Sequence, residues 1–120
     1  MIALLPLLLQ TAAVPVAADP AAGADPRLGE CLELASSDPV TAVVRANAWV
    51  SANGGAAAHQ CLGLAEAGSG RWDRAEAAFV KAALMAQERG AADEANLWMQ
   101  AGNAALADGQ GATALTHLDR

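Results

Sequence analysis

Cysteine and histidine have the widest chemical scope of the residues in this chain, which contains two of each: Cys31, Cys61, His59 and His117. As zinc ligands they are poorly spaced, because zinc sites use tight local pairs and only His59 and Cys61 are close in sequence. No C-x-x-C motif indicates a redox pair. Residues 1–18 carry no charged side chain, which is typical of an export signal, and two cysteines in an exported protein usually pair. We therefore expect a disulfide between Cys31 and Cys61, with free thiols as the alternative.

Neither histidine is accompanied by the groups that a catalytic site needs. No nucleophile motif or phosphate-binding loop lies near His59 or His117 in the sequence. Acidic pairs such as Glu30 and Glu33 are typical of solvated helix faces. We therefore predict that the protein is not an enzyme and that it uses neither a metal nor another cofactor.

The charge balance excludes one class of partner. The net charge is −6 at pH 7, with seven basic against thirteen acidic residues, and such a surface would repel a phosphate backbone. Only Arg71 and Arg74 stand close together, and Asp73 lies between them. We expect no nucleic-acid partner and no polybasic contact with anionic lipid.

The N-terminal segment indicates export, because residues 1–18 carry no charged side chain. An apolar stretch from Leu4 to Leu9 and small residues at Val16–Ala18 are typical of a secretory signal peptide. We assign 1–18 to this signal and 19–26 to a disordered lead, which predicts a periplasmic or secreted protein of a bacterial envelope without a membrane span after cleavage. The alternative is a retained anchor, although a spanning helix needs about 20 apolar residues.

The rest of the chain is predicted to be helical, because alanine is abundant and is the best helix former. Short segments rich in glycine, asparagine or proline separate the helices. In one of them Asp38 can cap a helix that starts at Pro39. The predicted helices span Arg27–Ser36, Pro39–Ala52, Ala56–Ala67, Arg71–Arg89, Ala92–Ala107 and Ala112–Arg120.

The chain matches itself when it is shifted by 39 residues. Glycine inside a helix costs about 1 kcal/mol relative to alanine, so Gly63 and Gly102 indicate close approach by a neighbouring helix. The matched alanines would face these glycines, and Phe79 and Leu118 would fill the gap one turn further on. This period is typical of an α-solenoid. The matched pairs are Gly63 with Gly102, Gly70 with Gly109, Ala75 with Ala114, Ala65 with Ala104 and Phe79 with Leu118.

These residues resemble the tetratricopeptide repeat, whose pattern is W-x2-L-G-x2-Y followed by A-x3-F and often by proline. The resemblance covers residues 56–120 and departs from the family in three ways. Glu66 and Ala105 stand where an aromatic residue is usual, the proline is absent, and the period exceeds the usual value of about 34. The matching residues are His59, Leu62, Gly63, Ala65, Trp72, Ala75 and Phe79, then Trp98, Gly102, Ala104, Ala114 and Leu118.

The resemblance implies an all-α fold, namely an α-solenoid of about three antiparallel helix pairs over residues 27–120. We assign 56–90 and 91–120 to two repeats, the second of which ends early, either as a truncated helix or because the array continues. We assign 27–55 to a degenerate first pair, because a shift of 33 aligns Ala42, Ala46 and Trp49 with Ala75, Phe79 and Ala82. The alternative is an alanine-rich bundle with a chance self-match.

By resemblance, the function is binding of a peptide or protein on the concave face, which the first helix of each repeat lines in this family. The alternative for these residues is an ordinary surface role. Alternative functions are an envelope assembly or stress factor that self-associates, and a membrane-anchored scaffold. The sequence does not identify the partner. The predicted partner-binding residues are Gln60, Leu64, Asn96, Met99, Asn103 and Leu106.

Overall fold

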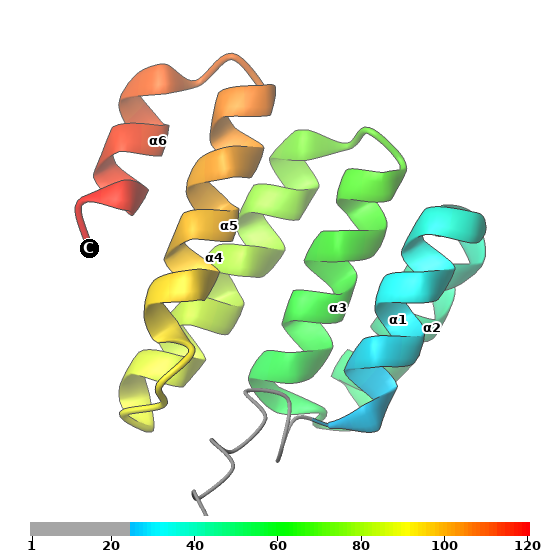
Figure 1. The fold of residues 1–120 in the computed structure, drawn as a ribbon. Helices are drawn as coiled ribbons and strands as arrows, with labels where there is room; N and C mark the ends of the chain where they lie inside the picture. Colours follow the sequence, from blue (N-terminus) through cyan, green and yellow to red (C-terminus); the bar gives the residue numbers. More distant parts are fainter. Residues whose placement is uncertain (1–24) are drawn as a thin grey trace, which may run out of the picture.

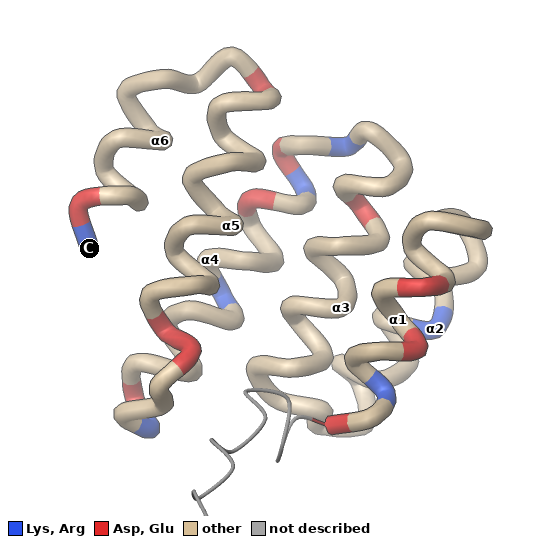
Figure 2. The backbone as a smooth tube through the Cα atoms, viewed as in Figure 1, with Lys and Arg blue, Asp and Glu red and all other residues tan. Residues whose placement is uncertain are grey.

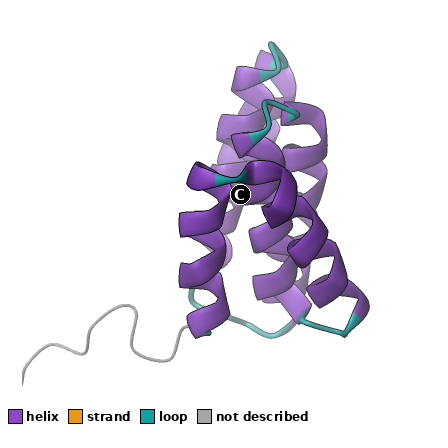
Figure 3. Ribbon diagram, turned by 90° about the vertical axis from the view of Figure 1, so that its right-hand side faces the viewer, coloured by secondary structure: helices purple, strands orange, loops and turns teal. Residues whose placement is uncertain are grey.

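The computed structural model describes residues 25–120, and the elements in this range are six helices (Figure 1). The range contains no strand, which confirms the predicted all-α class (Figure 3). No helix within it is both long enough and apolar enough to cross a membrane. The predicted signal peptide and residues 19–24 of the predicted lead lie outside the described residues. The helices are α1 (Pro26–Ser37), α2 (Pro39–Ser51), α3 (Gly55–Gly68), α4 (Trp72–Glu88), α5 (Glu94–Ala107) and α6 (Gly111–Leu118).

The first two helices begin at aspartate–proline pairs. The Asp25 carboxylate accepts a hydrogen bond from the Arg27 N–H at 3.0 Å, and Pro26 is the first residue of α1. The Asp38 carboxylate accepts from the Thr41 N–H and from the Thr41 hydroxyl, at 3.2 and 2.6 Å. These bonds lower the pKa of Asp38 below its ordinary value. The aspartates satisfy N–H groups that have no partner inside the helix.

Helices α3 and α5 end in the same left-handed turn. The turning residues are Gly70 and Gly109, with φ of 72° and 76°, a conformation that side chains with a Cβ rarely adopt. The next N–H then donates to a carbonyl five positions earlier, in the Schellman pattern. The two bonds are Arg71 N–H to Glu66 O at 2.9 Å and Gln110 N–H to Ala105 O at 2.8 Å.

Consecutive helices pack against one another, and α1 also packs against α3. The helices run alternately up and down and stand side by side in a row (Figure 1). Helices α1 and α2 lie at one end of this row, and α6 lies at the other. The first three helices therefore contact one another in all three pairings, whereas the later helices are added one at a time.

The 39-residue period appears in the bounds of the helices. Helix α3 spans 55–68 and α5 spans 94–107, so both ends differ by 39 (94 − 55 and 107 − 68). The starts of α4 and α6 also differ by 39 (111 − 72), whereas those of α2 and α4 differ by 33 (72 − 39). The shifts of 39 and 33 residues found in the sequence therefore recur as differences in residue number between helix ends.

The same period relates two contacts between glycine and a large side chain. A Cβ added at Gly63 would lie 2.6 Å from the Phe79 ring, and one added at Gly102 would lie 2.8 Å from Leu118. Ala75 and Ala114 are completely buried. In each pair, an apolar side chain of the second helix lies where the first helix has no side chain.

The core consists mostly of alanine, and Leu97 is the largest side chain that is completely buried. Small side chains let helix backbones approach closely, so few large groups are needed to fill the interior. Two of the larger side chains, Phe79 and Leu118, lie where a neighbouring helix has a glycine.

Candidate functional site

Four of the predicted partner-binding residues lie on α5 and are exposed: Asn96, Met99, Asn103 and Leu106. Their spacing of three, four and three residues keeps them on one face of the helix. Met99 is 47% and Leu106 is 54% exposed. This face therefore combines amide groups with accessible apolar side chains.

The two predicted residues on α3 are more enclosed. The Gln60 amide donates to the Gln100 side-chain oxygen at 3.2 Å and so links α3 to α5. Leu64 is half-buried and packs against the core near Ala65 and near Phe79. Gln60 thus lies beside the α5 face, whereas much of Leu64 is used in packing. Gln100 was missed by sequence reasoning, although it lies one turn after Asn96.

A second cluster joins α4, α5 and α6. The Nε2 of His117 lies 2.8 Å from a Glu76 carboxylate oxygen, and its ring stacks on Trp98 with 5.7 Å between centroids. The Trp98 N–H donates to Glu94 at 3.3 Å, and the guanidinium of Arg120 lies 4.4 Å from the Trp98 ring centroid. These contacts hold α6 against both α4 and α5.

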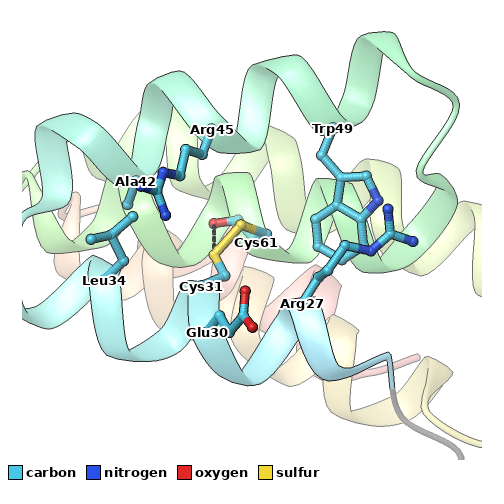
Figure 4. A pocket seen from close by; sticks show the side chains of 8 residues that line it. All are labelled: Arg27, Glu30, Cys31, Leu34, Ala42, Arg45, Trp49 and Cys61. Carbon is cyan, nitrogen blue, oxygen red and sulfur yellow. Dashed lines mark hydrogen bonds between the residues drawn. A yellow bond between two sulfur atoms is a disulfide. The ribbon is translucent and has the colours of Figure 1, made fainter.

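The predicted disulfide is confirmed. Cys31 on α1 and Cys61 on α3 are bonded, with 5.7 Å between their Cα atoms, and both are buried. The Cys31 sulfur also lies 3.4 Å from the Cys61 carbonyl oxygen, a close contact drawn as a dashed line in Figure 4. The disulfide ties the first helix to the third, so it fixes one side of the space between α1 and α2.

A pocket of about 170 Å³ lies between α1 and α2. Its walls are apolar and are formed by Leu34, Ala42 and the Trp49 ring, together with the disulfide that joins Cys31 on α1 to Cys61 on α3 (Figure 4). Neither its walls nor its charged rim were predicted as a site from the sequence. No motif marks it, because it results from the way three helices meet.

Three charged side chains line the same pocket. Arg27 is already engaged, since its guanidinium pairs with Asp25 at 2.7 Å and lies 4.6 Å from the Trp49 ring centroid. Glu30 from α1 and Arg45 from α2 extend toward the pocket from opposite sides (Figure 4). Neither forms an ion pair within residues 25–120.

A shallower groove of about 450 Å³ runs between α3 and α4 beside His59. Burial lowers the pKa of His59, and repulsion from Lys81 lowers that pKa further. Glu66 also borders the groove but is buried and pairs with Arg71 at 2.5 Å. Glu66, which stands where the repeat pattern has an aromatic residue, is thus a buried carboxylate that is paired with Arg71.

The described residues contain no cluster of three or more metal-ligating side chains. Their basic residues are dispersed among acidic ones along the helices (Figure 2). No protein-family model, curated protein or solved structure matches this chain.

Proposed function

We propose that the protein is a non-catalytic scaffold resembling the tetratricopeptide repeat, which binds an extended peptide or protein segment over α3 and α5. The observation that carries this proposal is the exposed α5 face formed by Asn96, Met99, Asn103 and Leu106, next to Gln60. The matching bounds of α3 and α5 support it, because equivalent helices of such a repeat line one shared face.

The chemistry of this face suits an extended chain. Asparagine amides can both donate to and accept from a peptide backbone, whose N–H and C=O groups are otherwise free in an extended segment. Methionine adapts its shape to different apolar side chains. The face therefore offers backbone recognition with moderate side-chain selectivity.

A peptide library displayed on phage, panned against the purified protein, tests this proposal. Leu106→Asp should weaken binding of the selected peptides by roughly tenfold or more, because it places a charge in an apolar contact. Leu32→Asp is the matched control, since Leu32 is 55% exposed on α1 and Leu106 is 54% exposed on α5. Equal affinities of the two variants for those peptides would count against the α5 face.

A second candidate function is self-association through α6, which is favoured by one observation. Leu115 is 69% exposed, and Leu118 remains 47% exposed although it packs on Gly102. If these side chains meet a second copy, Leu115→Asp lowers the mass measured by sedimentation, whereas Val40→Asp, at an equally exposed position on α2, does not. A wild-type protein that stays monomeric at high concentration excludes this candidate.

The proposed location is the periplasm or the exterior of a bacterial cell. The disulfide between Cys31 and Cys61 supports an oxidising compartment. Mass spectrometry of the protein recovered from the envelope tests signal cleavage, which we expect after residue 18. A mature chain that still begins at Met1 would instead support the anchored scaffold.

A further inference from the structure

We propose that the pocket between α1 and α2 binds a free α-amino acid with an apolar side chain. This site is separate from the face proposed for peptide binding, because its lining belongs to α1, α2 and the Cys31–Cys61 disulfide. The inference concerns a small ligand, so it stands or falls independently of the peptide proposal.

The pocket is an open volume of about 170 Å³ that the first helix pair leaves beside its own packed core. That core is formed by Ala46 and the two cysteines, which are buried. The pocket lies next to it, where Leu34 and Ala42 are the only aliphatic side chains in the lining.

The size and lining of this volume suit one apolar side chain. An apolar cavity of about 150 Å³ can accept a benzene molecule, so the pocket has room for a leucine or phenylalanine side chain. Leu34, Ala42 and the Trp49 ring would supply the contacts, together with the Cys31–Cys61 disulfide (Figure 4).

The charges lining the pocket suit the other half of the ligand. Arg45 and Glu30 lie on opposite sides of the pocket, and neither has an ion-pair partner among residues 25–120. Arg27 is held by Asp25 and Trp49. A zwitterion can use both uncommitted groups, with its carboxylate on Arg45 and its ammonium on Glu30. A simple anion or cation would leave one of them without a partner.

Titration calorimetry with L-leucine and three close relatives tests this assignment. Leucine should bind the wild-type protein. Glycine lacks the side chain, N-acetylleucine lacks the ammonium and leucinamide lacks the carboxylate, so each should bind roughly tenfold more weakly or worse. Binding of N-acetylleucine and leucinamide as tight as that of leucine would overturn the zwitterion assignment and point to a side chain of a partner protein. Absence of leucine binding would overturn the site.

Variants locate the binding on the protein. Glu30→Gln should weaken leucine but leave N-acetylleucine unchanged, and Arg45→Gln should weaken leucine but leave leucinamide unchanged. Arg89→Gln, outside the pocket, is the charge control. Leu34→Trp should abolish binding by filling the pocket that Leu34 lines, with circular dichroism as the check on folding. Because Glu30 and Arg45 are exposed, their variants keep the test decisive if Leu34→Trp does not fold. Leucine affinity unchanged in both charge variants contradicts the proposal.

Discussion

Gly63 lies where α3 faces the Phe79 ring, and a Cβ at this position would come within 2.6 Å of a ring carbon. Gly63→Ala should therefore destabilise the protein by about 1–2 kcal/mol, since the overpacking cost exceeds the gain in helix propensity. Gly29→Ala is the matched control, because nothing lies within 4 Å of its Cβ position. It should stabilise the protein by up to about 1 kcal/mol. Urea denaturation measures both, and a stabilising Gly63→Ala would refute the close approach.

Glu66 is 5% exposed, and its carboxylate depends on Arg71. Arg71→Ala would leave a buried carboxylate without its cation, and we expect a loss of about 1–3 kcal/mol. Arg74→Ala should cost less than about 0.5 kcal/mol, because Arg74 is exposed and forms no ion pair within the described residues. Thermal unfolding compares the two, and equal losses would mean that the buried pair has no special role.

His59 makes stability depend on pH. Its pKa in the folded protein is lowered, first by burial and then by Lys81. The unfolded chain therefore binds the proton more readily than the folded protein does. The contribution of neutral His59 to the free energy of unfolding is complete above the unfolded pKa of about 6.5 and is lost as the pH falls below it. His59→Gln should flatten the decrease in unfolding free energy between neutral and mildly acidic pH. If the free energy of unfolding of the variant depends on pH as steeply as that of the wild type, titratable groups other than His59 cause the decrease.

At the scale of helices, the bounds were largely predictable. Every predicted helix exists, and the predicted ends lie within two residues of the observed ones. The exception is the sixth helix, which was predicted to continue through Arg120 and instead ends at Leu118. The reason is local. An aspartate–proline pair begins α2, and glycine adopts the left-handed backbone conformation that ends α3 at Gly70 and α5 at Gly109. Such signals involve residues within one turn of the chain, so they can be recognised from the sequence alone.

Contacts between helices were less predictable. The Gln60–Gln100 bond and the His117–Glu76 pair join residues 40 and 41 positions apart. Both depend on the crossing of two helices and on side-chain rotamers, which periodicity does not specify. The pocket between α1 and α2 was not predicted for the same reason, because its lining comes from three different helices.

The disulfide acts at this same scale, because it holds α1 against α3. It closes a loop of 30 residues, so replacing both Cys31 and Cys61 by alanine should cost about 3–4 kcal/mol. Hydrogen exchange should show faster opening of α1 amides, with little change in α5. Uniform loss of protection over all helices would instead indicate that the whole row unfolds as one unit.

At the scale of the whole molecule, an alanine core lets helices stack with few large side chains, and the bounds of α3 and α5 differ by 39 residues at both ends. The N-terminal end carries the disulfide and the pocket, and the α5 face lies further along the row. The two proposed sites therefore lie on different helices of one chain.

The most direct test of the central claim is amide chemical-shift mapping by NMR, with a peptide selected against the protein. We predict that the largest shifts occur at Met99, Asn103 and Leu106 and at the Gln60 and Gln100 side-chain amides. Shifts confined to α1 and α2, or absent from α5, would contradict the account of this protein as a scaffold that binds through α3 and α5.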